Sequence, residues 1–225
     1  MKYESTTEAL FSERPNRFIA RVQMPDGHTE TVHVKNTGRC RELLLPGCRV
    51  ILAASGHPGR KTAYDLVAVY KQGTGLINID SQAPNIAMKE WLLAQDYDYV
   101  RSEYTYGNSR VDFYMEKNGV KTLCEVKGCT LEVNGTGYFP DAPTERGTKH
   151  LKELTGAVRA GYKAALAFVI QIPGVKQVFP NEATDPAFSR ALKEAMQAGV
   201  EVWYMLCRVE KDGMRITERV KALSE

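Results

Sequence analysis

The residue pair Asn118-Gly119 is the feature that most constrains the fold of this chain. An Asn-Gly pair between two segments of alternating apolar and polar residues is typical of a two-residue β-hairpin turn. If Lys117 faces Val120 across this turn, the same register places Asp112 opposite Glu125 on the neighbouring strand. The hairpin therefore predicts two carboxylates side by side in a sheet.

The same register predicts what each face of the hairpin carries, because side chains alternate between the two faces of a strand. The face toward the core is expected to hold apolar residues from both strands, namely Val111, Phe113, Met115, Thr122, Cys124 and Val126. The other face is expected to be charged and to hold Arg110, Asp112, Glu125 and Lys127.

The preceding segment, residues 99–106, is predicted to join this sheet through a turn at Gly107-Asn108, which would bring Glu103 beside Asp112. Neighbouring residues of a middle strand form hydrogen bonds to opposite sides, so two regular two-residue turns are incompatible with this register. One turn is expected to be wider, or a strand to contain a bulge. Adjacent carboxylates destabilise a sheet unless a cation lies between them. We therefore expect a metal site with Asp112 and Glu125 as ligands and Glu103 as a third.

Composition limits the class of protein. The 225 residues include 43% hydrophobic residues, enough for one large or two small domains with proper cores. Five cysteines without a Cys-x-x-Cys spacing predict reduced thiols rather than disulfides or a zinc site. No apolar run of membrane-spanning length occurs, so we expect a cytoplasmic protein without a membrane partner. The net charge of +3 is small, so any nucleic-acid-binding surface must be local.

Residues 1–81 are predicted to form an all-β domain. Short apolar runs, separated by turns rich in Gly, Pro and Asp, occupy residues 18–24, 30–35, 49–54, 64–70 and 76–79. Five short strands in a domain of this size favour a small barrel such as an OB-fold, an architecture that often binds single-stranded nucleic acid.

Basic residues gather in this first domain and again near the start of a later helix. They indicate either an ordinary solvated surface or a DNA-binding surface of which single-stranded and duplex DNA are both possible ligands. For Lys149, an ion pair with Glu153 one helical turn later is an equally good explanation. The candidate DNA-binding residues are Arg17, Arg39, Arg41, Arg60, Lys61, Arg146 and Lys149.

Residues 82–225 are predicted to form a second domain with a mixed sheet flanked by helices, of the α+β or α/β class. Amphipathic or capped helices are expected at residues 86–94, 148–160 and 186–198, and strands at 99–106, 110–117, 120–127, 163–171, 200–209 and 214–217. The continuous apolar run at 163–171 is typical of a strand buried on both faces. The turn-rich segment 128–147 lies beside the charged strand end and is expected to be functional.

Two carboxylates on adjacent strands, with a lysine two residues after the second, suit metal-dependent hydrolysis of a phosphodiester. Asp112 and Glu125 would hold Mg²⁺ or Mn²⁺, both of which prefer oxygen ligands. Lys127 would orient the attacking water or neutralise developing charge. The alternative is that Glu-Val-Lys is an ordinary solvent-facing strand pattern. His150 is expected to be a surface or capping residue, and Cys124 to serve packing.

The chain resembles the sugar fermentation stimulation protein family of bacteria and archaea. The resemblance rests on stretches spread over nearly the whole chain, including Asn16-Arg17-Phe18, Asn78-Ile-Asp80-Ser-Gln, Tyr106-Gly-Asn-Ser-Arg-Val-Asp-Phe113, Cys124-Glu-Val-Lys-Gly-Cys-Thr130 and Phe139-Pro-Asp-Ala-Pro-Thr-Glu-Arg-Gly147. It implies an N-terminal OB-like domain and a second domain similar to the PD-(D/E)xK nucleases, which have a restriction-endonuclease-like fold.

The resemblance also implies a site and a function. The nuclease signature falls on Asp112, Glu125 and Lys127, with Val111 in place of the proline of the motif. The family resemblance further implies DNA binding linked to sugar utilisation, maltose in particular. Three functions therefore stay open: a metal-dependent nuclease, a non-catalytic DNA-binding regulator of sugar-utilisation genes, and a nucleic-acid-binding module of a larger complex in which catalysis is lost or conditional.

Overall fold

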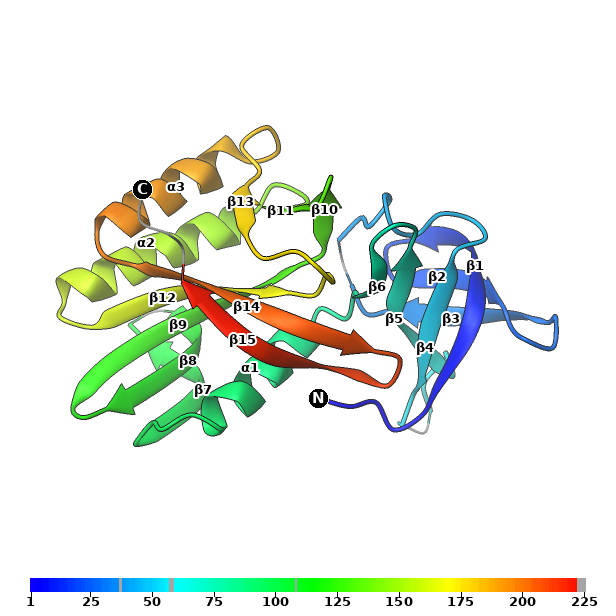
Figure 1. Cartoon of the computed structure of the whole chain (residues 1–225), viewed down its shortest axis with the longest axis horizontal. Helices are drawn as coiled ribbons and strands as arrows, with labels where there is room; N and C mark the ends of the chain where they lie inside the picture. Colours follow the sequence, from blue (N-terminus) through cyan, green and yellow to red (C-terminus); the bar gives the residue numbers. More distant parts are fainter. Residues whose placement is uncertain (37, 57–58, 108, 222–225) are drawn as a thin grey trace.

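The structure is a computed structural model that describes residues 1–36, 38–56, 59–107 and 109–221. Figure 1 shows a β-barrel formed by the first third of the chain beside a larger part built on a mixed sheet. The predicted architecture, an OB-like barrel followed by a mixed-sheet domain with helices, is confirmed. The start of the chain extends away from the barrel, because Lys2 forms a β-bridge with Gly213 of the mixed-sheet part.

Five strands close the barrel in the order β1-β2-β3-β5-β4, with β4 returning to pair with β1. These strands are β1 (Thr6–Asn16), β2 (Ile19–Gln23), β3 (Thr29–Val34), β4 (Arg49–Ala54) and β5 (Tyr64–Lys71), and β6 (Gly75–Asn78) pairs beside β5. Strand β1 was not predicted from the sequence. This strand contains Pro15 and buries only Ala9 and Phe11, so its apolar pattern is weak.

The second sheet has six strands in the order β15-β14-β12-β9-β8-β7. They are β7 (Tyr99–Tyr106), β8 (Ser109–Lys117), β9 (Val120–Cys129), β12 (Lys163–Ile170), β14 (Glu201–Glu210) and β15 (Gly213–Lys221). The central strand β12 runs parallel to both β9 and β14, and the other pairs are antiparallel. All of β12 after Lys163 is buried, which confirms the strand predicted from its continuous apolar run.

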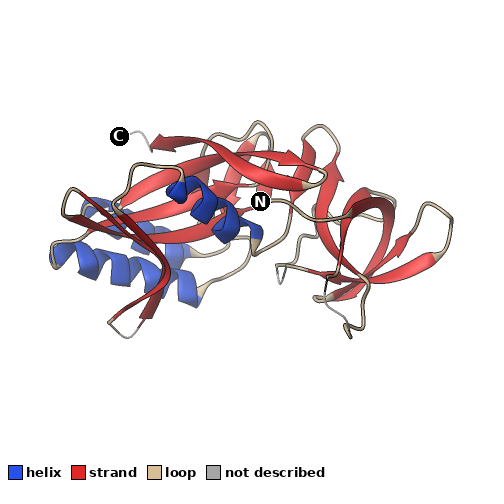
Figure 2. Ribbon diagram, turned by 90° about the horizontal axis from the view of Figure 1, so that it is seen from below, coloured by secondary structure: helices blue, strands red, loops and turns tan. Residues whose placement is uncertain are grey.

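Helices cover both faces of this sheet (Figure 2). The helices α2 (Glu145–Arg159) and α3 (Pro186–Gln197) pack on one face, and α1 (Ala83–Leu93) packs on the other. The side chain of Asp185 accepts a hydrogen bond from Phe188 N and caps α3, which starts at Pro186 where the helix at residues 186–198 was predicted to begin. Within the described residues, no helix is long and apolar enough to cross a membrane.

The segment predicted as a loop at residues 128–147 contains short strands. Asn134-Gly135 forms a turn between β10 (Leu131–Val133) and β11 (Thr136–Phe139), and β13 (Val178–Pro180) completes a small three-stranded sheet. This segment ends at the start of α2, where Thr144 accepts a hydrogen bond from Gly147 N. It therefore connects the end of β9 to α2 along an ordered path.

The predicted β8–β9 register is confirmed from Phe113↔Cys124 to Lys117↔Val120. Asn118 and Gly119 both have positive φ, as a two-residue turn of this type requires. The prediction that one face is core and the other charged is wrong. Tyr114 and Leu123, on the face covered by α2, are as buried as Phe113 on the face covered by α1, because helices cover both sides.

An irregularity lies in the middle of β7 and β8. The predicted β7–β8 register holds on both sides of it, at Ser102↔Phe113 and at Tyr104↔Val111, but Glu103 has a φ of 51° and does not pair with Asp112. Val111 packs with the α2 face whereas Phe113 packs with the α1 face, so the predicted common face of these two residues is also wrong. The irregularity expected either in a turn or within a strand is therefore within the strands, at Glu103 and Asp112. Asn108, in the predicted Gly107-Asn108 turn, lies outside the described residues.

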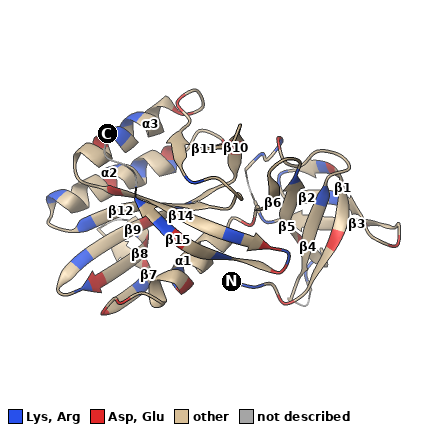
Figure 3. Ribbon diagram, viewed as in Figure 1, with Lys and Arg blue, Asp and Glu red and all other residues tan. Residues whose placement is uncertain are grey.

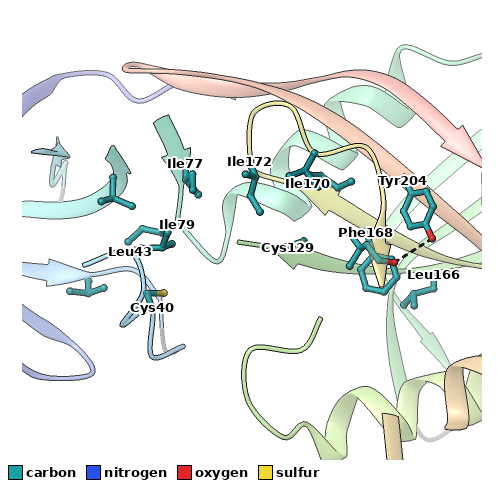
Figure 4. Packing of buried hydrophobic residues seen from close by; sticks show 14 of the residues in the cluster. Cys40, Leu43, Ile77, Ile79, Cys129, Leu166, Phe168, Ile170, Ile172 and Tyr204 are labelled. Carbon is teal, nitrogen blue, oxygen red and sulfur yellow. Dashed lines mark hydrogen bonds between the residues drawn. The ribbon is translucent and has the colours of Figure 1, made fainter. Parts of the chain in front are cut away.

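The barrel and the mixed-sheet part share one apolar core. Figure 4 shows Leu43, Ile77 and Ile79 of the barrel approaching Ile170, the last residue of β12, and Ile172 just after it. Polar contacts reinforce this junction. The amide nitrogen of Gln171 lies within hydrogen-bonding distance of the carbonyl oxygens of Asn78 and Asp80, and Lys71 forms a salt bridge with Glu132. The two parts therefore form a continuous unit rather than independent modules on a linker.

Candidate active site

Asp112 lies where β8 and β9 diverge. Backbone pairing between these strands ends at Phe113↔Cys124, one residue short of Asp112. The Oδ2 atom of Asp112 accepts a hydrogen bond of 2.8 Å from Val126 N, and its Oδ1 atom accepts one of 2.8 Å from Asn85 Nδ2 of α1. Two separate elements therefore fix the carboxylate.

Glu125 is the most buried acidic residue of the site, with 3% of its area exposed. Its Oε1 atom accepts a hydrogen bond of 2.7 Å from Lys127 Nζ, which comes from the same face of β9. The same oxygen contacts Nδ1 of His150 on α2. A strand and a helix thus hold this carboxylate from two directions.

The electrostatic environments of the two carboxylates differ. Burial raises the pKa of Asp112, and the charge of Glu125 nearby raises it further. Burial would also raise the pKa of Glu125, but the contacts with His150 and Lys127 outweigh burial and hold that pKa below its usual value. Glu125 is therefore compensated by the ammonium group of Lys127 and by its contact with His150, whereas the direct hydrogen-bond donors to Asp112 are neutral amide groups.

This donor set fits a divalent cation such as Mg²⁺ or Mn²⁺. Such ions bind through one or two carboxylates and complete their coordination with water. A cation beside Asp112 would supply the positive charge that its amide and backbone donors lack. Over the ranges that the structure describes, no cluster of three His, Cys, Asp or Glu side chains is arranged for metal binding. The protein would thus contribute two carboxylates and leave positions open for water or substrate.

Glu103 does not lie in this cluster. Its side chain is 68% exposed and is 3.6 Å from Arg110, with which it forms an ion pair. The positive φ of Glu103 removes it from the regular pairing that would have placed it next to Asp112. The expected alignment of three carboxylates across three strands is therefore wrong. Of the three, only Asp112 and Glu125 lie near each other.

A cleft of about 300 Å³ lies beside this pair, between the barrel and the mixed-sheet part. Its lining includes Pro84, Gly128 and Gln171. Pro84 precedes Asn85, the partner of Asp112, and Gly128 follows Lys127. A Cβ atom on Gly128 would lie 2.5 Å from Gln171 Oε1 and 2.8 Å from Pro84 Cγ. The absence of a side chain at this position thus lets Gln171, which contacts Asn78 and Asp80 of the barrel, pack closely against β9 and the start of α1 next to the acidic pair.

Comparison with known proteins identifies the family. The model described as the SfsA N-terminal OB domain matches residues 13–79, and the model of the sugar fermentation stimulation protein RE domain matches residues 82–213. The chain belongs to the sugar fermentation stimulation protein family. The resemblance inferred from the sequence is thereby confirmed.

Relatives in this family match along their full length. A sugar fermentation stimulation protein homolog of Ruminiclostridium cellulolyticum is 48% identical, covering 98% of this chain and 99% of its own. The homolog of Desulfitobacterium hafniense strain DCB-2 is 49% identical, covering 95% and 94%. Among solved structures, Pyrococcus furiosus SfsA in complex with Ca²⁺ is 28% identical, with a TM-score of 0.81 and coverage of 98% and 95%.

In this member of the sugar fermentation stimulation protein family, the seven predicted DNA-binding residues do not form one surface. Arg17, Arg39 and Arg41 line a common pocket of about 450 Å³ on the barrel. Arg60 instead forms hydrogen bonds of 3.0 and 2.7 Å to both oxygens of Asp65. Lys61 is exposed on the barrel.

The two candidates of the second domain lie on α2. Lys149 is 3.6 Å from Glu153, the i,i+4 ion pair considered as its alternative explanation. Arg146 Nε lies 3.4 Å from Nε2 of His150, so this guanidinium is next to the buried histidine that contacts Glu125. Arg146 is therefore near the acidic pair, whereas Lys149 is engaged along its own helix.

Three residues of the site were not predicted from the sequence. His150 was expected at the surface but is buried against Glu125, because the face of α2 that carries it packs on β9. Asn85 and Gln171 were not singled out, since their partners lie on other elements. A signal for His150 did exist: Leu151 and Leu154 mark the buried side of α2, and His150 is four residues before Leu154.

Proposed function

We propose that this protein binds DNA and hydrolyses its phosphodiester bonds with a divalent cation held by Asp112 and Glu125. The observation that carries the proposal is the convergence of the buried carboxylate of Glu125 and the partly buried carboxylate of Asp112 with the ammonium group of Lys127. When bound, Mg²⁺ or Mn²⁺ would polarise a phosphoryl oxygen and lower the pKa of a water ligand. The water attacks the phosphodiester directly, so no side chain of the site needs to form a covalent bond with the substrate.

The chain's own residues would prepare the reaction. Asn85 and Val126 N hold Asp112 in one orientation, and His150 holds Glu125 in another. Lys127 Nζ is 2.7 Å from Glu125 and would move or reach from there to the attacking water or to the oxygen on which charge develops. Such preorganised groups stabilise a transition state without reorganising during the reaction.

The solved relative gives independent support for a cation. The Pyrococcus furiosus protein was solved in complex with Ca²⁺. Ca²⁺ shares with Mg²⁺ the preference for oxygen ligands, although it accepts longer and less regular coordination. A divalent-cation site in this chain is consistent with that likeness.

A second function is a non-catalytic, DNA-binding regulator of sugar-utilisation genes, for example those for maltose. It is favoured by the partners that Glu125 already has within the protein, since its Oε1 atom contacts both Lys127 and His150. A site of that kind could persist for stability alone. In this alternative the name of the family would reflect gene regulation, with DNA bound and not cut.

The two functions are separated by a cleavage panel. Labelled single-stranded, duplex and branched DNA, and RNA, are incubated with wild type, Asp112→Asn or Lys127→Ala in EDTA, Mg²⁺ or Mn²⁺. We expect cleavage only by wild type and only with metal, while Lys127→Ala retains most of its DNA binding. Equal cleavage by wild type and Asp112→Asn would identify a contaminant. DNA binding by wild type without cleavage of any substrate would refute hydrolysis and favour the regulator.

A further inference from the structure

We propose that the DNA taken by this protein is a single strand, which lies in a groove running from a cationic pocket on the barrel to the acidic pair. Only the end point of this groove, at Asp112 and Glu125, depends on the proposed function. The binding of a single strand is a separate property that can be measured without cleavage.

The cationic pocket has a volume of about 450 Å³ and is lined by Arg14, Arg17, Arg39 and Arg41 together with Gly38. Lys, Arg, Asp and Glu are interspersed over the rest of both parts (Figure 3), which makes this local excess of arginine distinctive. Within the described ranges, Arg17, Arg39 and Arg41 are exposed and form no salt bridge. Three free guanidinium groups around one hollow are suited to phosphate groups.

Arg14 organises the pocket and does not add a free charge. Its guanidinium donates hydrogen bonds of 2.7 to 2.9 Å to the carbonyl oxygens of Arg17, Asn36, Gly38 and Arg39. These four carbonyls come from the β1–β2 turn and from the segment after β3, so one side chain ties two loops together. The arginines on those loops are therefore held in place before any ligand arrives, which reduces the entropic cost of binding.

An exposed aromatic ring beside the pocket points to unpaired bases. Phe18 is 44% exposed, and the guanidinium of Arg17 lies 4.7 Å from its ring centroid. Aromatic side chains next to a basic groove provide stacking platforms for the bases of single strands. In a duplex the bases are already stacked on each other inside the helix, so Phe18 would have no base face to contact.

The cationic pocket and the cleft beside the acidic pair meet at Gly38. Gly38 also lines the cleft of about 300 Å³ that contains Pro84, Gly128 and Gln171. A Cβ atom on Gly38 would lie 2.5 Å from Asp141 Oδ2, so Asp141 is in contact with Gly38 and a bound strand must run past these two residues, not between them. Because Asp141 would repel phosphates, the phosphate backbone is expected to run on the arginine side of this point.

The size of these two hollows favours a single strand over a duplex as the ligand. Both volumes fall in or near the range of small-ligand sites, which is about 300 to 1,000 Å³. Hollows of this size accept a few nucleotides of one strand, whereas a duplex, whose major groove alone is about 12 Å wide, is too large to enter either of them. A single strand, with one phosphate backbone and separate bases, matches the cationic pocket and the exposed ring of Phe18.

The test measures binding by fluorescence anisotropy in EDTA, where a metal-dependent nuclease cannot cut. The probes are labelled oligothymidylates of about 5 and about 20 nucleotides, chosen around the site sizes of OB-folds, and a duplex hairpin with the same number of phosphates as the longer one. The variants are Arg39→Ala, Phe18→Ala and Phe18→Trp. Arg215→Ala, an exposed arginine on β15, is the matched control.

We expect wild type to bind the long single strand roughly tenfold or more tighter than the duplex and tighter than the short strand. Arg39→Ala should weaken single-strand binding and lower the salt slope by about 0.7, the value for one phosphate contact. Phe18→Ala should weaken it roughly tenfold, Phe18→Trp should restore it, and Arg215→Ala should leave it unchanged.

Duplex binding equal to or tighter than single-strand binding would overturn the proposal, as would equal losses in Arg39→Ala and Arg215→Ala. A long strand that binds no tighter than the short one would overturn the continuous groove. None of these results depends on turnover. Loss of the proposed nuclease function would therefore appear as strong single-strand binding without cleavage in the separate metal panel.

Discussion

Val126 N donates its hydrogen bond to the side chain of Asp112, at 2.8 Å, and not to the main chain of β8. In an antiparallel ladder every second residue pair exchanges backbone hydrogen bonds, and here these are Lys117↔Val120 and Phe113↔Cys124 with one such pair between them. If the ladder continued, the next hydrogen-bonded pair would be Val111 with Val126. The carboxylate thus replaces a backbone acceptor at the point where the strands separate. Its position is set by the sheet itself, which explains how a charged group can be fixed beside Glu125.

Asp112→Asn tests whether this carboxylate binds a cation. The substitution removes a charge whose burial and proximity to Glu125 raise the pKa of Asp112, but it leaves one acceptor for the two hydrogen bonds from Val126 N and Asn85. These effects oppose each other, so the stability of the metal-free protein should change by no more than about 1 kcal/mol. Wild type should gain thermal stability with Mg²⁺ or Mn²⁺, and the variant should not.

Thermal melts over a metal titration supply this measurement, and Glu103→Gln is the matched control because Glu103 lies outside the cluster. An unchanged metal response in Asp112→Asn would show that the stabilising ion binds elsewhere.

His150→Ala tests the coupling between α2 and β9. The substitution removes one of the two partners of the buried Glu125 carboxylate, leaving only Lys127, and should destabilise the protein by roughly 1 to 3 kcal/mol. In a Glu125→Gln background the same change should cost less. Urea denaturation of the four proteins in this double-mutant cycle gives the coupling free energy, for which we expect about 1 kcal/mol or more. A coupling near zero would mean that the histidine does not hold Glu125.

Gly128→Ala tests the close packing beside the acidic pair. The added Cβ would meet Gln171 Oε1 at 2.5 Å, and Gln171 links the mixed-sheet part to Asn78 and Asp80 of the barrel. We expect a loss of roughly 1 to 3 kcal/mol in the free energy of unfolding, as for other overpacking changes. Gly156→Ala in α2 is a control with the opposite expected effect. No atom lies within 4 Å of the added Cβ, and alanine is more favourable than glycine in a helix by about 1 kcal/mol, so this change should stabilise the protein. Equal effects of the two changes would contradict this packing.

Arg14→Lys tests the organisation of the cationic pocket. Lysine keeps the charge but cannot replace a planar guanidinium that donates to four carbonyl groups. We expect a lower melting temperature and weaker binding of single-stranded DNA, although Arg14 is not expected to touch the strand. Arg208→Lys, at an exposed ion pair with Glu210, should change neither quantity. A normal DNA affinity in Arg14→Lys would show that the loops do not need this residue.

Local patterns were sufficient to predict much of the fold. Asn118-Gly119 fixed the hairpin register, and Asp185-Pro186 marked the start of α3. The five cysteines are free thiols, as expected. In these cases the information lies within a few residues, because turn geometry, helix capping and burial periodicity are local properties.

The missed features depend on contacts between distant segments. The apolar pattern of β1 is weak because the strand wraps the barrel with only one narrow buried stripe. The displacement of Glu103 follows from the irregularity in β7, for which the sequence carried no positional signal. His150 reaches Glu125 only because α2 packs on β9, and the apolar face of the helix was the one local indication of this contact. Such contacts require the tertiary arrangement.

The most direct test of the central claim is an anomalous-difference map from a crystal of this protein soaked in Mn²⁺. We expect one strong peak within coordination distance of an oxygen of Asp112 and an oxygen of Glu125, and loss of that peak in Asp112→Asn. A strong peak bound to neither carboxylate, or no peak at this position in a crystal that takes up Mn²⁺ elsewhere, would contradict the claim.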